Sequence, residues 1–174
     1  MVFYYDQAQL GTVPTGRRCP RPRGRPVRVP HAGRVERHYL HGALCYPTGE
    51  WYFRTLPRMD AASVVAFCRA LLADFPGREL WLILDSAPAH RGHELQALLR
   101  AQPRLRLQFQ PTYAPWTNPV ERVWQEMRRA VTHSHDLPTL GALLAAAQRW
   151  CERFAQAPQA ARRLASFQRA HLTS

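Results

Sequence analysis

The chain has 174 residues and a net charge of +12, with 24 Lys and Arg against 12 Asp and Glu. This length fits one domain with a hydrophobic core of its own. No apolar run approaches the ~18 residues of a membrane-spanning helix, the first residues are strand-like rather than a basic leader, and the four cysteines form no CxxC pair. The composition therefore argues against a membrane protein, a signal peptide, a zinc knuckle and a disulfide framework, and it favours the cytoplasm.

All 24 basic residues are arginine. Codon bias in a GC-rich genome is the simplest explanation of the lack of lysine. The planar guanidinium group nevertheless suits phosphate, and so large an excess of positive charge favours a polyanionic partner such as nucleic acid. A solvated basic surface or an acidic protein partner are the alternatives.

The first predicted strand covers residues 2–5, which are β-branched or aromatic, and ends at Asp6. Residues 11–30 are rich in Arg, Pro and Gly and predict an extended basic loop inserted after this strand. Its arginines are expected to contact DNA phosphates, because so many close positive charges repel one another without a counter-charge. A solvated linker is the alternative. The arginines concerned are Arg17, Arg18, Arg21, Arg23, Arg25 and Arg28.

The rest of the chain alternates strands and helices. Strands are predicted at 35–46, 51–56, 80–84 and 105–109, and helices at 60–75, 92–101, 119–131 and 138–155. The order predicts an α/β fold with a mixed sheet and helices packed on its faces. Residues 1–155 are expected to form one catalytic domain, and residues 156–174 a tail with room for one more short helix.

Three carboxylates stand at the ends of these elements. Asp6 and Asp85 each follow an apolar strand, and Glu121 lies in the first turn of the helix that starts at Asn118 and Pro119. If the two strands are neighbours, both aspartates project from an edge where open α/β sheets bind ligands. Converging carboxylates require cations, and hard oxygen ligands suit Mg²⁺ or Mn²⁺. Two such ions would catalyse displacement at phosphorus.

Each of these residues also has a purely structural interpretation. Asp85 could cap the turn that follows it, and Glu121 could complete a capping box with Asn118. Asp6 could be a solvated residue near the terminus, and His90 a partly buried histidine that hydrogen-bonds the turn. No one of these signals decides between the two interpretations.

The combination of two segments is more specific. The runs LDSAPAH (84–90) and PTYAPWTNPVERVW (111–124) resemble the DDE transposases of the mariner superfamily, in particular their bacterial insertion-sequence branch. Asp6 matches the first aspartate of that family, and 35 residues separate Asp85 from Glu121, close to its usual spacing. Two positions depart from the pattern: Gln7 stands where Glu is common, and Ser86 where Asn is frequent. The matching positions are Asp85, His90, Tyr113, Pro115, Asn118, Pro119, Val120, Glu121 and Trp124.

The resemblance implies a ribonuclease H-like fold, with a mixed five-stranded sheet and helices on both faces. It implies a metal-dependent transposase that cuts transposon ends and joins the 3′-hydroxyl to target DNA, typically at a TA dinucleotide. Asp6, Asp85 and Glu121 would hold two Mg²⁺ or Mn²⁺ ions, whereas Trp124 belongs to the core. A catalytically inactive nucleic-acid-binding remnant, or another ribonuclease H-like nuclease such as a junction resolvase, are the alternatives. Secondary residues near the scissile phosphate would be His90, Tyr113, Trp116 and Asn118.

The resemblance also implies partners. These are the DNA of the transposon ends and of the target, and a second copy of the chain in a homodimer. Relatives normally carry N-terminal helix-turn-helix modules, whereas this chain begins at the first catalytic strand. Three explanations are open: one half of a split reading frame, a trimmed form of a longer protein, or a decayed remnant. In the first case, recognition of the transposon ends is expected to reside in a separate helix-turn-helix subunit from the adjacent reading frame. The expected location is the bacterial cytoplasm, in association with the nucleoid.

Overall fold

A computed structural model describes residues 1–11, 36–46, 48–111, 118–132, 137 and 139–165. Residues 12–30 of the predicted basic loop, with all of its arginines, lie outside these residues, as do Tyr113 and Trp116. The strands are β1 (Val2–Gly11), β2 (Arg37–Cys45), β3 (Glu50–Leu56), β4 (Leu80–Leu84) and β5 (Leu105–Phe109). The helices are α1 (Ala61–Asp74), α2 (His93–Ala101), α3 (Val120–Met127), α4 (Leu140–Ala155) and α5 (Pro158–Ala165), with a 3₁₀-helix η1 (Pro88–Arg91) and a π-helix η3 (Arg128–Thr132).

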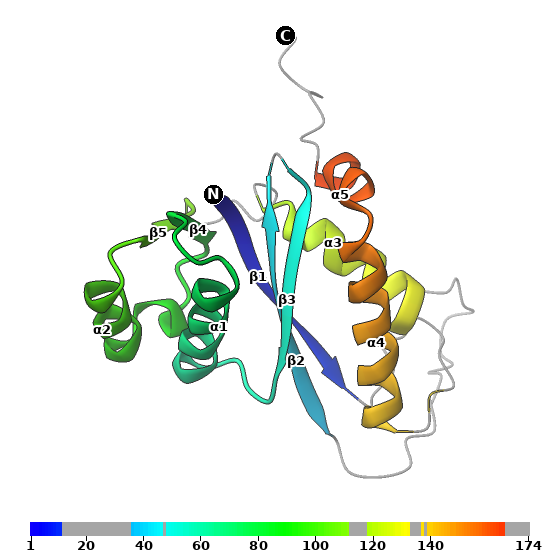
Figure 1. The fold of residues 1–174 in the computed structure, drawn as a ribbon. Coiled ribbons are helices and arrows are strands. Elements are labelled where there is room, and N and C mark those ends of the chain that lie inside the picture. The colour runs from blue at the N-terminus through cyan, green and yellow to red at the C-terminus, as the bar shows by residue number, and fades with distance from the viewer. Residues whose placement is uncertain (12–35, 47, 112–117, 133–136, 138, 166–174) are drawn as a thin grey trace, which may run out of the picture.

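The five strands form one mixed sheet in the order β3-β2-β1-β4-β5. Strands β1, β2 and β3 pair antiparallel, whereas β4 runs parallel to β1 and β5 runs parallel to β4. Helices α1 and α2 lie on one side of the sheet, and α3, α4 and α5 lie on the other (Figure 1). The predicted five-stranded mixed sheet with helices on both faces is therefore confirmed.

Strand β1 contributes side chains to both faces of the sheet. Phe3 and Tyr5 are buried in the core cluster that includes α1, whereas Ala8 and Leu10 are buried in the cluster that includes α3 and α4. Successive side chains of a strand point to opposite faces, so a central strand covered on both sides must be apolar at most positions. The position of Asp6 within this strand is thus an exception that asks for a functional explanation.

The predicted end of the first strand at Asp6 is wrong. Strand β1 continues to Gly11, and its residues from Phe3 onward pair with β2, with Asp6 opposite Gly42. The sequence after Asp6 is polar at Gln7 and Gln9, so a search for apolar runs does not detect this part of the strand. Its alternation with the buried Ala8 is nevertheless the period of two that a strand requires, and pairing with β2 supplies the backbone hydrogen bonds.

The other elements follow the predicted ranges closely. Strands β4 and β5 have the predicted bounds, and Asp60 caps α1 by accepting a hydrogen bond from the Ser63 N–H at 2.9 Å. The helix predicted at 119–131 is divided, because it ends as α3 and continues as η3. The tail contains α5, whose Ala161 is fully buried against the second core cluster. The longest helix, α4, has 16 residues, and no helix in the described ranges has the length and apolarity needed to cross a bilayer.

Gly42 lies where β2 packs against the rings of Trp51 and of Trp124 in α3. A Cβ atom at this position would overlap the ring of Trp51 and would lie 2.6 Å from Cζ2 of Trp124. We therefore expect Gly42→Ala to lower the free energy of unfolding by about 1–3 kcal/mol, as overpacking of a core does. Urea denaturation measures this loss. Gly141→Ala in α4 is the matched control, because its Cβ would meet only open space and one atom at 3.9 Å, so a loss as large in the control would contradict the explanation.

Candidate metal centre

Asp6 and Asp85 lie side by side across two parallel strands. The register of β1 and β4 pairs Tyr4 with Ile83. Asp6 lies two residues beyond Tyr4 and Asp85 two residues beyond Ile83, so both aspartates follow the last paired residues at the same edge. Asp85 is the first residue after β4. The side chain of Asp6 lies on the α3 face, because its directly paired neighbour Gly42 presents its Cβ position to Trp124 of α3. Strands β1 and β4 are thus neighbours, as predicted, although only β4 ends beside the two aspartates.

Asn118 links the start of α3, which carries Glu121, to strand β1, which carries Asp6. Its side chain is buried, its Nδ2 donates to the backbone oxygen of Tyr5 at 2.9 Å, and its Oδ1 accepts from the Val120 N–H at 3.1 Å. Tyr5 precedes Asp6, and Val120 precedes Glu121. One buried amide therefore joins the backbone beside Asp6 to the backbone beside Glu121. Trp124, predicted as a core residue, is buried with 1% exposure.

The electrostatics agree with this placement. Burial and, after it, the nearby charges of Glu121 and Asp85 together raise the pKa of Asp6 to about 7, against the opposing effects of the Gln7 backbone N–H and the Arg128 guanidinium. Burial also raises the pKa of Glu121, again opposed by Arg128. Asp6 thus lies within electrostatic reach of both other carboxylates, which is the condition that a divalent cation relieves.

In the segment after β4, Asp85 caps the turn and the buried His90 hydrogen-bonds it, as the purely structural interpretations of these residues predict. Oδ1 of Asp85 accepts from the Ala87 N–H at 3.0 Å, which forms an Asx-turn, and lies 2.7 Å from Nδ1 of His90. The same Nδ1 lies 3.0 Å from the backbone oxygen of Asp85. His90 is buried, whereas the Asp85 side chain is 63% exposed. The turn therefore leaves Asp85 accessible to a ligand and conceals the histidine beneath it.

Asp6, Asp85 and Glu121 offer the oxygen ligands that suit a hard cation, but in this structure the three side chains are not close enough together to form a complete site. Three carboxylates and no thiolate are the ligands that Mg²⁺ or Mn²⁺ prefers. Within the described ranges, however, no three His, Cys, Asp or Glu side chains are close enough to form a ready metal site. The carboxylates are neighbours that repel one another, and a cation would be needed to draw them together.

Gln7, where the family pattern has Glu, serves the opposite face of the sheet. Its Nε2 donates to the hydroxyl of Tyr5 at 2.7 Å, and that hydroxyl lies 2.7 Å from Nδ1 of the fully buried His41. Nε2 of His41 lies 3.1 Å from the backbone oxygen of Arg58, so it carries a hydrogen and Nδ1 accepts from Tyr5. Burial lowers the pKa of His41 to about 4. The substitution of Gln for Glu thus leaves the carboxylate cluster unchanged and completes a neutral buried chain of hydrogen bonds.

Arg128 carries a positive charge near the carboxylates that the sequence pattern alone does not single out. It is the first residue of η3, and its charge acts on both Asp6 and Glu121. It follows Glu121 by seven residues, a spacing that places two side chains on one face of a helix. That spacing was the available signal.

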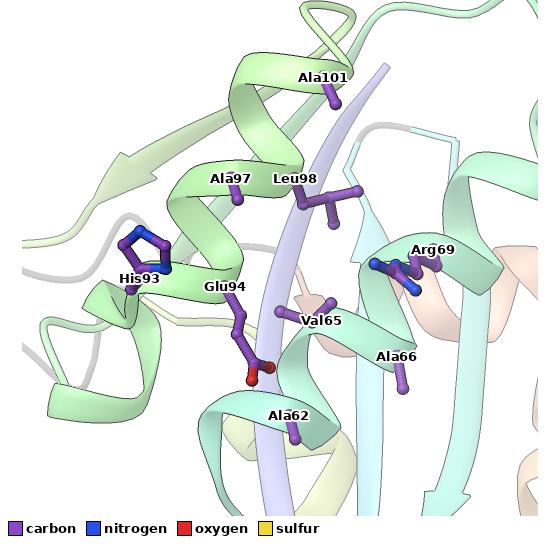
Figure 2. Close-up of a pocket in the computed structure, with 9 residues that line it drawn as sticks. All are labelled: Ala62, Val65, Ala66, Arg69, His93, Glu94, Ala97, Leu98 and Ala101. Atoms are coloured by element: carbon purple, nitrogen blue, oxygen red, sulfur yellow. The ribbon is translucent and has the colours of Figure 1, made fainter.

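The described residues also line hollows that are separate from this cluster. One of about 590 Å³ lies between α1 and α2, and its lining includes the small side chains of Ala62, Ala66 and Ala97 (Figure 2). It contains none of the predicted site residues. The candidate metal centre lies instead at the end of β4, where Asp85 follows the strand.

The fold, with its carboxylates near the end of β4, can be compared with solved structures to find the class of protein. The structure is similar to the mariner Mos1 transposase in its paired-end complex with Mg, with a TM-score of 0.64 at 14% identity, covering 94% of this chain and 53% of that one. It is also similar to the catalytic core domain of BIV integrase, with a TM-score of 0.51 at 15% identity, covering 84% of this chain and 80% of the other. The predicted ribonuclease H-like fold is therefore confirmed.

The sequence comparisons narrow the class to a family. The family model for the DDE superfamily endonuclease matches residues 1–144. The "Insertion element IS630 uncharacterized 39 kDa protein" of Shigella sonnei is 31% identical over 144 residues, which cover 82% of this chain and 42% of that relative. The chain belongs to the DDE superfamily endonucleases, and the predicted membership of the mariner group, on its insertion-sequence branch, is confirmed. It spans about two fifths of the length of this relative.

Proposed function

We propose that the chain is the catalytic domain of a metal-dependent DNA transposase, which cuts transposon ends and joins the freed 3′-hydroxyl to target DNA. The observation that carries this proposal is Asp6, a carboxylate in the middle of a central strand whose pKa is raised by burial and then by Glu121 and Asp85. No structural need explains a carboxylate there, whereas a cation-binding role does. Family membership and the insertion-element relative support the same reading.

Asp6, Asp85 and Glu121 are the residues proposed to hold two Mg²⁺ or Mn²⁺ ions. Such ions, when bound, supply Lewis-acid activation of the attacking oxygen and neutralise the leaving oxygen. Solved Mos1 paired-end complexes are described with Mg and with Mn, which supports this choice of ion. Within the chain, Asn118 sets the spacing of the first turn of α3 from β1, and Arg128 limits the charge of the cluster before the ions arrive.

DNA is the proposed substrate, both as transposon end and as target. A Mos1 complex is described with a left transposon end, and the net charge of +12 favours a polyanion. Tyr113 and Trp116 are proposed to lie near the scissile phosphate, and the arginines of loop 11–30 to contact the DNA backbone. His90 and Asn118 are buried, so we propose that they act through neighbouring residues. A homodimer, a separate helix-turn-helix subunit and a nucleoid-associated cytoplasmic location complete the proposal, with residues 1–155 as the catalytic domain.

Nicking of supercoiled plasmid in Mg²⁺ or Mn²⁺ tests the proposal. We expect the wild-type chain to nick DNA and Asp85→Ala to be reduced to background, because the variant loses a metal ligand on the accessible edge. Glu152→Gln removes an exposed carboxylate of α4 and is the matched control. Equal nicking by wild type and Asp85→Ala would exclude the metal assignment. Binding of DNA with a steep salt dependence, without nicking by either protein, would favour the catalytically inactive alternative.

A further inference from the structure

His90 is concealed directly beneath Asp85. Its ring is 3% exposed and meets the ring of Tyr5 edge-on, with 5.6 Å between centroids and 73° between planes. Tyr5 is the residue of β1 that precedes Asp6. The histidine therefore connects the segment that follows β4 to the strand that carries the other aspartate.

The direction of the hydrogen bonds is determined by their partners. Nδ1 of His90 lies 3.0 Å from the backbone oxygen of Asp85 and 2.7 Å from its Oδ1. A carbonyl oxygen only accepts, so Nδ1 carries a hydrogen and donates to both oxygens of the same residue. This holds whether or not the ring also carries a hydrogen at Nε2.

Both hydrogen bonds to the Asp85 carboxylate reach the same oxygen. Oδ1 accepts from Nδ1 of His90 and from the Ala87 N–H, which leaves Oδ2 without a donor among the described residues. An aspartate side chain that is 63% exposed would otherwise exchange freely between rotamers, at an entropic cost on each binding event. Two donors on one oxygen remove that freedom and keep the other oxygen available.

We propose that His90 is a positioning residue, which holds Asp85 through Oδ1 so that Oδ2 is presented to a divalent cation. This inference rests on the proposed function, because it concerns the same cation. Partners of metal ligands in the surrounding shell typically change metal affinity by about 10–100-fold when they are replaced. The same range is expected here, and the effect is on metal affinity rather than on the chemical step.

Two isosteric replacements of His90 test the proposal on the full chain. In His90→Asn the side-chain amide occupies the position of Nδ1, whereas in His90→Gln it occupies the position of Nε2. Titration of the metal-free protein with Mn²⁺, read by the free ion in solution, gives the affinity. We expect Asn to bind within about threefold of wild type and Gln about 10–100-fold more weakly. Excess Mn²⁺ should then restore plasmid nicking by His90→Gln.

Further variants distinguish a failure of the role proposed for His90 from a failure of the metal assignment itself. His90→Leu keeps much of the ring volume without a donor and should bind as weakly as Gln, and circular dichroism verifies that each variant is folded. Equal affinities for Asn and Gln, or wild-type affinity for Leu, would overturn the positioning role. Asp85→Asn, in contrast, tests the proposed function itself. If it does not weaken Mn²⁺ binding, the metal assignment fails, whereas weak binding by Asp85→Asn with unchanged binding by His90→Leu refutes only the role of His90.

Discussion

Asp6→Asn is expected to raise the free energy of unfolding of the metal-free protein by up to about 4 kcal/mol at pH 8 and to reduce DNA nicking to background. The carboxylate is surrounded by the charges of Glu121 and Asp85, and burial with these charges raises its pKa to about 7 from the 3.8 of an unfolded chain. Since one pKa unit corresponds to about 1.4 kcal/mol, ionised Asp6 destabilises the folded state. The neutral amide removes that cost together with the metal ligand.

The pH dependence of this effect has a definite sign. Between pH 3.8 and about 7 the folded state retains a proton on Asp6 that the unfolded state has released, so the contribution of Asp6 to stability falls as the pH rises. The advantage of the Asn variant should therefore be absent near pH 3, grow through this window and level off above pH 7. Urea denaturation at a series of pH values gives both curves.

Metal ions provide the control for the same variant. A ligand that binds only the folded state stabilises it, so Mn²⁺ at pH 8 should raise the stability of wild type and have little effect on Asp6→Asn. Glu152→Gln, at an exposed site on α4, should behave as wild type throughout. An Asn variant that is less stable than wild type at pH 8 without metal would show that Asp6 is a structural residue.

Asn118→Ala is expected to lower the free energy of unfolding by about 2–4 kcal/mol and nicking by about 100-fold. Its removal leaves two groups without partners at a buried position, the backbone oxygen of Tyr5 and the Val120 N–H. Each buried group that loses its hydrogen bond costs about 1–3 kcal/mol. The larger effect on activity follows from displacement of Glu121 relative to Asp6, since an error of about 1 Å in a reacting group can cost two orders of magnitude in rate.

Asn118→Asp separates the two functions of this side chain. The carboxylate can still accept from the Val120 N–H, but it loses the donor to Tyr5 and brings two acceptors together. We therefore expect Asp to retain the start of α3, measured by circular dichroism, and to lose nicking as Ala does. Gln125→Ala, an exposed amide on α3, is the control, and wild-type nicking by Asn118→Asp would exclude the positioning role.

Much of the site was accessible from the sequence because it depends on local patterns. Asp85 follows a short apolar run whose ends match β4, and Asn118 and Pro119 mark the start of α3 before Glu121. Asp6 was found for a reason that is only partly correct, since the strand that carries it does not end there. Arg128 was missed, because the effect of its charge depends on which side chains the divided helix brings near it.

The sequence by itself determined the alternation of strands and helices, the three acidic positions and the family. Only the tertiary structure decided that β1 extends through Asp6 to Gly11, that Asp6 lies near Asp85, and that the side chains of His90 and Asn118 are buried. The physical reason is that periodicity and capping arise among residues a few positions apart, whereas strand register and burial depend on partners far along the chain. The hydrogen bond from Asn118 to Tyr5 spans 113 positions, and no local pattern records it.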